Sequence, residues 1–234
     1  MTEAVTFTGV IDSIREHTAH LLGTTISYDE DDWAEPTALA GWTRSHIAAH
    51  LVEEALNMIE VLRHDDASAH ALPSAEDRQR ALERRALDAG IELQIELDET
   101  SGQLQDVLAV VGDDELAVTL SGGWEIQGRE VPLVRLREVV VHHFDLIGEA
   151  ALDVDDDMAQ ALLALEVRRP RSEELPPVLL VADEGFSARI GDEDGETTTV
   201  LGPANDLLIW LARGITTSNV SGTADLEADI SHPS

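Results

Sequence analysis

The sequence predicts an α+β protein, with an N-terminal four-helix bundle over residues 1–150 and a small α+β domain with an antiparallel sheet over residues 151–234. In the first part, apolar residues recur at helical spacing in long segments. In the second part, prolines interrupt the chain and short apolar runs alternate with turns, which is typical of strands. Apolar residues make up 43% of the chain and aromatic residues only 3%, so we expect a globular core of Ala, Leu, Val and Ile.

The second, third and fourth predicted helices of the bundle are bounded by residues that commonly start or end helices. Thr43 is a suitable N-cap for the second helix, and Ser74 begins a capping-box pattern for the third. Pro132 suits the first turn of the fourth helix, and Gly148 suits its C-cap. Gly90 is a candidate break inside the third helix. The helices are expected at residues 5–23, 43–62, 75–111 and 132–148.

The remaining elements follow from glycines, prolines and short apolar runs. Three glycines between residues 116 and 133 indicate a short hairpin or an ordered loop before the fourth helix. Past residue 151, a helix, three strand-like runs and a second helix are expected at 156–168, 178–182, 186–190, 197–201 and 203–213. A last strand is expected around Val220. This order predicts a small antiparallel sheet accompanied by helices.

Charge and composition exclude several classes of protein. The net charge is −32, with 47 acidic residues against 15 arginines and no lysine, so nucleic-acid binding is not expected. No apolar run is long enough to span a bilayer, and the first residues, Met1-Thr-Glu-Ala-Val, do not resemble a signal peptide. We therefore expect a soluble cytoplasmic protein without a membrane partner, either a monomer or a homodimer.

The chain contains no cysteine, which limits the chemistry it can carry. It cannot form a disulfide, supply a thiolate nucleophile or hold zinc through sulfur. Any metal must be bound by His, Asp or Glu, and any thiol used in a reaction must come from outside the protein. The zinc-protease motif His-Glu-x-x-His, the P-loop, and the Gly-x-Ser-x-Gly and Gly-x-Gly-x-x-Gly motifs are also missing.

A carboxylate and an imidazole lie four residues apart in the fourth predicted helix. Glu138 and His142 share one helix face, and the valines around them indicate that this face is buried. Buried groups of this kind are costly unless they are paired or bind a ligand. The second predicted helix offers a further inward histidine, either His46 or His50, and spacing does not choose between them. Two histidines and a carboxylate suit Zn²⁺ or a similar divalent ion and leave a coordination position open.

The same spacing allows other interpretations of the histidines. Glu138 and His142 can also be a simple hydrogen-bonded or surface pair. His143 is rotated by about 100° from His142 along the helix and is expected to face elsewhere. The histidines interpreted as solvated are His17, His20, His64, His70 and His232.

Two segments resemble a known family of metalloenzymes. Residues 41–51, Gly-Trp-Thr-Arg-Ser-His-Ile-Ala-Ala-His-Leu, and residues 137–142, Arg-Glu-Val-Val-Val-His, are similar to the mycothiol-dependent maleylpyruvate isomerase family, part of the DinB-like metalloenzyme superfamily. Residues 200–214 resemble the closing helix of that family, so the resemblance covers nearly the whole chain. It implies a DinB-like bundle with a zinc ion, or another divalent metal, bound by His50, Glu138 and His142.

The same resemblance implies a functional arginine and a reaction. Ser74-Ala-Glu-Asp-Arg78 aligns with a Ser-Pro-Glu-Ala-Arg-like stretch of the family, with Ala75 in place of proline, which gives Arg78 a catalytic and cofactor-binding role. The implied reaction is the cis–trans isomerisation of maleylpyruvate, a small dicarboxylate, to fumarylpyruvate with mycothiol or a similar low-molecular-weight thiol. Arg78 would bind a carboxylate of the substrate or cofactor. Weaker candidates for this task are Arg44, Arg135 and Arg213.

Two other functions are compatible with the same residues. One is a mycothiol S-transferase of the same superfamily, which would join the thiol to an electrophile at the same metal site. The other is a non-catalytic module that binds a metal or another ligand. Substrate assays separate the first alternative from the isomerase. A protein that binds zinc but neither a thiol nor an enoyl diacid would favour the second.

Overall fold

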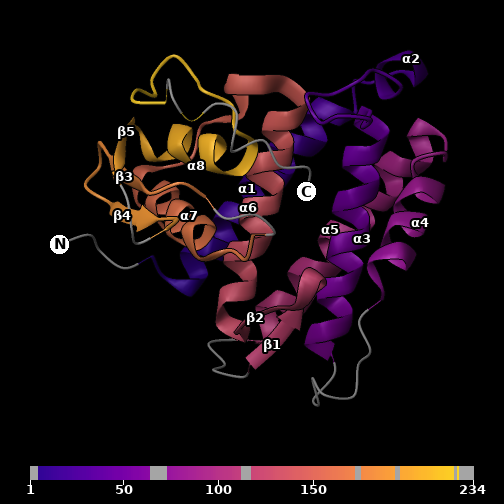
Figure 1. The fold of residues 1–234 in the computed structure, drawn as a ribbon. Helices are drawn as coiled ribbons and strands as arrows, with labels where there is room; N and C mark the ends of the chain where they lie inside the picture. Colours follow the sequence, from indigo (N-terminus) through magenta and orange to yellow (C-terminus); the bar gives the residue numbers. More distant parts are fainter. Residues whose placement is uncertain are drawn as a thin grey trace. The chain divides into compact units, whose positions relative to one another are not determined.

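The computed structural model describes residues 5–63, 73–111, 117–171, 175–192, 196–223 and 226 (Figure 1). The chain separates into two compact units, one formed by Thr6–Ile147 and the other by Gly148–Ser234 together with Met1–Val5. Long helices dominate the first unit, and a three-stranded sheet with two helices characterises the second. The predicted α+β class is therefore confirmed.

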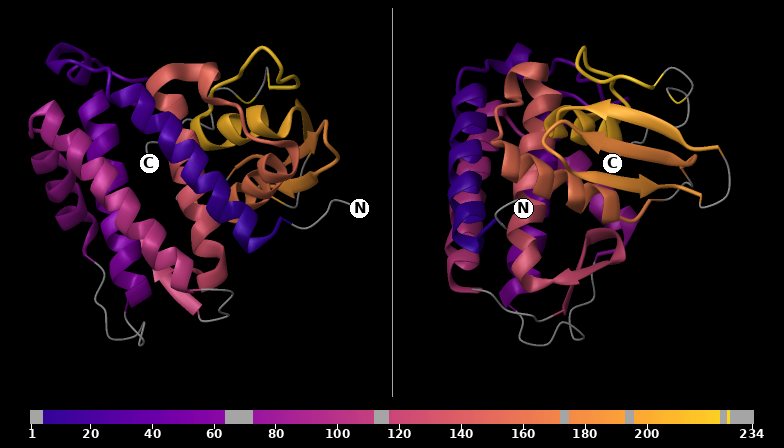
Figure 2. Two further views of the ribbon diagram at one scale, coloured as in Figure 1. Left: turned by 180° about the vertical axis from the view of Figure 1, so that it is seen from behind. Right: turned by 90° about the vertical axis from the view of Figure 1, so that its left-hand side faces the viewer.

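Four long helices of the first unit form the predicted bundle (Figures 1 and 2). They are α1 (Phe7–Thr25), α3 (Arg44–Arg63), α5 (Gly90–Val111) and α6 (Val131–Ile147). Helix α3 packs against α5 and α6, and α1 packs against the same two helices. Two shorter helices, α2 (Glu30–Trp33) and α4 (Ala75–Arg85), pack against α3. Among the helices that the structure describes, none is long and apolar enough to cross a membrane.

The third predicted helix consists of two helices, because the chain turns before Gly90. Helix α4 ends at Arg85 and α5 begins at Gly90. A side chain at position 90 would collide with the ring of Trp33, whose nearest atom lies 2.1 Å from an ideal Cβ position. The backbone nitrogen of Gly90 also donates to the carboxylate of Glu30 at 3.1 Å. The glycine therefore lets α5 start in close contact with α2.

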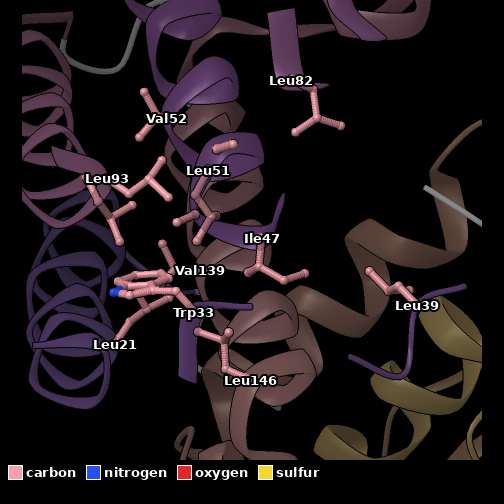
Figure 3. Packing of buried hydrophobic residues seen from close by; sticks show 13 residues of the cluster. Leu21, Trp33, Leu39, Ile47, Leu51, Val52, Leu82, Leu93, Val139 and Leu146 are labelled. Carbon is pink, nitrogen blue, oxygen red and sulfur yellow. The ribbon is translucent and has the colours of Figure 1, made fainter. Parts of the chain in front are cut away.

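Aliphatic side chains fill most of the bundle core, as expected from the small number of aromatic residues. Figure 3 shows Leu21 of α1, Leu51 of α3, Leu93 of α5 and Val139 of α6 among the buried residues, together with Trp33. Burying each side chain of this kind contributes roughly 1.5–3 kcal/mol. This packing holds α3 and α6 side by side, and these two helices carry the predicted metal ligands.

A short hairpin precedes α6, in the segment where the glycines indicated one. Strand β1 (Ala117–Leu120) pairs antiparallel with β2 (Trp124–Gln127) through the turn η1 (Ser121–Gly123). Gly122 has a φ of 77°, in the left-handed region that favours glycine. Strand β1 packs against α3, which brings the hairpin beside the bundle. A second short turn, η2 (Gly128–Glu130), leads into α6.

The second unit contains a mixed sheet. Its elements are η3 (Gly148–Ala151), α7 (Asp156–Arg168), β3 (Val178–Ala182), β4 (Ser187–Ile190), β5 (Thr198–Gly202) and α8 (Ala204–Arg213). Strands β3 and β4 are antiparallel, as predicted, whereas β5 runs parallel to β3. Strand β4 returns the chain to the start of β3, so Thr198 pairs with Val178 and β5 takes the direction of β3. The strand expected near Val220 is an isolated bridge between Leu201 and Ser221.

Candidate functional site

Helix α6 places a carboxylate and an imidazole on the side that faces α3. Glu138 and His142 are one turn apart and both are buried. His50 on α3 lies opposite them, with its Nε2 3.2 Å from Oε2 of Glu138, and Nε2 of His142 is 3.3 Å from the same oxygen. One ligand atom from each residue falls within 4.8 Å of the others. The fold thus brings together the three residues predicted to bind a metal.

A buried carboxylate orients the ring of His142. Oδ2 of Asp145 lies 2.8 Å from Nδ1 of His142, and neither side chain is exposed. A carboxylate at this distance favours a proton on Nδ1 and leaves Nε2 directed at Glu138. Metal-binding histidines usually have such a partner on the second ring nitrogen. The three ligand atoms and this partner therefore fit a divalent ion such as Zn²⁺.

The charge states of the cluster also suit a cation. Burial by itself would raise the pKa of Glu138, but the Arg137 charge, the nearby His142 ring and the hydrogen bond with His50 hold that pKa well below its ordinary value. Nη1 of Arg137 lies 2.7 Å from Oε1 of Glu138. Burial lowers the pKa of His50, against the opposing hydrogen bond with Glu138. An ionised carboxylate and a neutral imidazole are the forms that bind metal ions.

The indole of Trp42 covers one side of the two histidine rings. Its centroid lies 5.4 Å from the ring of His50 and 6.3 Å from the ring of His142, and it is tilted by only 12° from the latter. Trp42 is partly exposed on one side and lies against both histidine rings on the other, so it separates part of the cluster from water. Sequence reasoning did not identify Trp42 as a site residue. The signal that could have identified Trp42 is its position just before the helix that carries His50.

A second acidic side chain lies near the cluster and was also missed. Glu54 follows His50 by one turn on α3, and its side chain forms a hydrogen bond with Ser121 in the hairpin turn. Burial raises the pKa of Glu54, and the charge of Glu138 adds to this effect. The charges of His50 and Arg78 and the Ser121 hydrogen bond act in the opposite direction. The spacing of four residues from His50 was a signal, because it places both side chains on one helix face.

Arg78 lies in the first turn of α4, near Glu54. It is partly buried, and its charge contributes to the pKa of Glu54. Nη1 of Arg78 donates to the backbone oxygen of Pro73 at 2.7 Å, whereas Arg80 and Arg85 of the same helix form ion pairs with carboxylates. A guanidinium has five N–H donors, so Arg78 has further donors for the carboxylate of a ligand.

Comparison with known proteins identifies the family. Residues 14–147 match the family model of the mycothiol maleylpyruvate isomerase N-terminal domain, which is more than half of the chain. The chain belongs to this family. The resemblance of residues 41–51 and 137–142 is therefore confirmed. No curated protein matches the sequence.

Two crystal structures of the mycothiol-dependent maleylpyruvate isomerase share the fold of this family member. One is of a histidine-to-alanine mutant, with a TM-score of 0.80 and 18% sequence identity. The other has a TM-score of 0.79 and 19% identity. Each match covers 92% of this chain and 92% of the other. At such identity the likeness establishes the fold, and the activity has to be inferred from the site.

The structure distinguishes the two α3 histidines that spacing left open. Nδ1 of His46 lies 2.8 Å from Oγ1 of Thr43, and its Nε2 is 3.6 Å from Oε2 of Glu83 on α4. His46 therefore turns toward α4. His50 is the α3 histidine that reaches Glu138.

His143 lies on another side of α6 from His142, as its rotation predicted. Its Nε2 is 2.8 Å from Oγ1 of Thr24 on α1, and burial, together with nearby His20 and His17, lowers its pKa to about 4. The prediction that His17 is solvated is wrong, because this residue lies on the buried stripe of α1 and is only 5% exposed. His20 is exposed, as predicted. The other histidines interpreted as solvated, His64, His70 and His232, lie outside the described residues.

The three weaker arginine candidates have other surroundings. Arg135 is buried in the bundle, where it donates to the backbone of α3 and to Ser101 of α5. The guanidinium of Arg44 lies over the ring of Tyr28, 4.6 Å from its centroid. Arg213 belongs to the second unit. Of the four arginines considered, Arg78 is the one whose contacts best suit binding of a ligand carboxylate.

Proposed function

We propose that this family member catalyses the mycothiol-dependent cis–trans isomerisation of maleylpyruvate to fumarylpyruvate, with a divalent metal such as Zn²⁺ bound by His50, Glu138 and His142. The observation that carries the proposal is the convergence of three ligand atoms within 4.8 Å in a chain that has no cysteine. The two relatives in fold are described as a mycothiol-dependent maleylpyruvate isomerase, which supports the same activity for this chain.

The proposed reaction needs sulfur from outside the chain. The carbon–carbon double bond of maleylpyruvate does not rotate freely, so a nucleophile must convert it temporarily to a single bond. Such a nucleophile cannot be a cysteine here. A bound metal would hold the thiol sulfur of mycothiol and keep it ionised near neutral pH. Three protein ligands leave room for that sulfur, which is the pattern of catalytic rather than structural zinc sites.

The side chains around the cluster control its local charge. Glu138 supplies one negative charge to the metal, and Arg137 beside it supplies one positive charge. Asp145 supplies a second negative charge behind His142. With a dication bound, these groups sum to a net positive charge. Local positive charge matters because a protein with a net charge of −32 repels a dicarboxylate substrate.

Arg78 is the residue proposed to bind a carboxylate of the substrate or of the cofactor. Its planar guanidinium can form two parallel hydrogen bonds with a carboxylate, a geometry that lysine cannot provide. It lies near Glu54, which follows the proposed ligand His50 by one turn. A carboxylate bound there would have its charge balanced and its orientation restricted relative to the metal.

The proposal is tested by measuring metal content and maleylpyruvate turnover, with and without mycothiol, for the wild type and two variants. His50→Ala removes a proposed ligand. His46→Ala is the matched control, because it removes a histidine one turn earlier on α3 that turns toward α4. We expect the wild type and His46→Ala to bind stoichiometric metal and to need mycothiol for turnover. We expect His50→Ala to lose the metal and the activity together.

The possible outcomes separate the parts of the proposal. A metal-loaded wild type that does not convert maleylpyruvate in the presence of mycothiol would exclude the isomerase. Conjugation of mycothiol to an electrophile by that same protein would instead support an S-transferase. Stoichiometric zinc in His50→Ala would show that the ligand set is wrong.

A further inference from the structure

The ion pair between Arg137 and Glu138 joins two consecutive residues of α6. Consecutive side chains on a helix point about 100° apart and do not normally face each other. Arg137 is nevertheless 1% exposed, and its Nη1 lies 2.7 Å from Oε1 of Glu138. A buried guanidinium needs a charge partner in the protein interior. Its side chain is therefore held against one particular oxygen of the neighbouring carboxylate.

The two carboxylate oxygens of Glu138 have different partners because of the contact with Arg137. Oε1 accepts from Arg137, and Oε2 faces both histidines, at 3.2 Å from His50 and 3.3 Å from His142. A carboxylate can bind a metal through one oxygen or through both. With Oε1 engaged by a charge-assisted hydrogen bond, Oε2 is the oxygen presented to an ion between the histidines.

We propose that Arg137 is a positioning residue that restricts Glu138 to coordination through one oxygen, and so keeps a coordination position of the metal open. The inference rests on the proposed metal site and deepens it. A site of two nitrogens and one oxygen leaves a fourth tetrahedral position for an incoming thiol sulfur. If Glu138 used both oxygens, its second oxygen would compete for the space that the sulfur needs.

Arg135 provides a matched comparison within the same helix. It is also 1% exposed, but it donates to the backbone oxygen of Leu51 at 3.0 Å and to Oγ of Ser101 at 3.3 Å. Replacing Arg135 removes a buried positive charge without releasing Oε1 of Glu138. A general effect of losing a buried arginine therefore appears in both variants, whereas an effect on coordination appears only when Arg137 is changed.

The test uses Co²⁺ as the metal, because its visible absorption reports coordination number. Four-coordinate Co²⁺ absorbs several-fold more strongly than five- or six-coordinate Co²⁺. We expect Arg137→Met to show weaker visible absorption per bound Co²⁺ and a weaker sulfur-to-cobalt band on addition of mycothiol. Arg137→Lys, which keeps a cationic donor, and Arg135→Met should both resemble the wild type. Unchanged bands in Arg137→Met would overturn the proposal.

The wild type provides a second measurement if Arg137→Met does not fold. X-ray absorption of the zinc-loaded wild type should show four light donor atoms, and one of them should be replaced by sulfur when mycothiol is added. Five or more donors before addition of the thiol would overturn the role of Arg137 while leaving the metal site intact. A wild type that binds neither Co²⁺ nor Zn²⁺ would instead overturn the proposed metal site, and this inference with it.

Discussion

Helix α6 carries two adjacent histidines that lie in different environments. On the side facing α3, His142 has carboxylates on both ring nitrogens, Glu138 at 3.3 Å and Asp145 at 2.8 Å. On the side facing α1, His143 contacts the hydroxyl of Thr24 at 2.8 Å. We call these the α3 side and the α1 side of α6. Each side gathers more than one histidine, because His50 lies on the first and His17 is near His143 on the second.

The difference between the two sides shows what distinguishes a candidate metal site from a group of satisfied histidines. Burial lowers the pKa of His50 on the α3 side and of His143 on the α1 side. On the α3 side, an ionised Glu138 is available to balance a cation. On the α1 side, the neighbouring histidines lower the pKa of His143 further, to about 4, so a positive charge there is disfavoured. The position of carboxylates, rather than the number of histidines, decides where a cation can bind.

Glu138→Leu should have the largest effect on the free energy of unfolding, because it removes the negative charge that balances Arg137 on the α3 side. The variant removes a carboxylate that the buried guanidinium of Arg137 contacts at 2.7 Å. Breaking a buried ion pair in this way typically costs about 3–5 kcal/mol. We expect a loss of that size in the free energy of unfolding of the metal-free protein, measured by urea denaturation. The double variant Arg137→Met/Glu138→Leu should recover most of it, and a single variant as stable as wild type would contradict the charge-balance argument.

Asp145→Asn tests the orientation of His142 without removing a proposed ligand. The carboxylate of Asp145 lies 2.8 Å from Nδ1 of His142, and loss of such partners typically lowers metal affinity by about 10–100-fold. We expect a decrease of this size in Zn²⁺ affinity, measured by competition with a chromophoric chelator. Thr24→Val is the matched control, because it removes the partner of the other histidine. Equal zinc affinities in wild type and Asp145→Asn would show that Asp145 does not orient the ligand.

Thr24→Val should affect stability and leave metal binding unchanged. Oγ1 of Thr24 donates to the backbone oxygen of His20 at 3.2 Å, so it is available to accept from Nε2 of His143. Losing a partly buried hydrogen bond of this kind costs about 1 kcal/mol. We expect a decrease of that size in thermal unfolding experiments, with Thr24→Ser close to wild type. A change of zinc affinity in Thr24→Val would show that the two sides of α6 are coupled.

The sequence predicted the fold and the cluster residues well, because both depend on short-range patterns. Caps and helical periodicity located α1, α3 and α6, and spacing placed Glu138 and His142 on one face. Spacing did not separate His46 from His50, because the two lie one turn apart on α3 and the choice depends on Thr43 and on α4. The resemblance to the family favoured His50, which is the histidine that the fold brings to Glu138.

The features that sequence reasoning missed depend on which groups the fold brings into contact. His17 was expected on a solvated face, but it lies on the buried stripe of α1, the helix that packs against α6. The contact between Arg137 and Glu138 was not predicted, because consecutive residues on a helix do not usually pair. The parallel pairing of β5 with β3 depends on the path of the chain after β4, which periodicity does not determine. In each case the missing information was the identity of the partner.

Glu54→Gln should have the smallest effect on the free energy of unfolding, and the size of that effect depends on pH. Burial raises the pKa of Glu54 above its ordinary value of 4.5, so the folded protein holds this proton more tightly than the unfolded chain. Glu54 therefore contributes stability below about pH 4.5, and this contribution is lost as the pH rises through the pKa of the folded state. Glutamine resembles the protonated acid at every pH.

We expect metal-free Glu54→Gln to match the free energy of unfolding of the wild type near about pH 4 and to exceed it near about pH 8. Urea denaturation at the two pH values measures this difference. Glu54 lies one turn from His50, on the α3 side, where the charge of Glu138 raises its pKa. A bound cation would lower the pKa of Glu54, so saturating Zn²⁺ should reduce the difference in free energy of unfolding between Glu54→Gln and the wild type. An advantage that is independent of both pH and zinc would show that Glu54 is not electrostatically linked to the cluster, and the α3 side would then be charged only at the cluster itself.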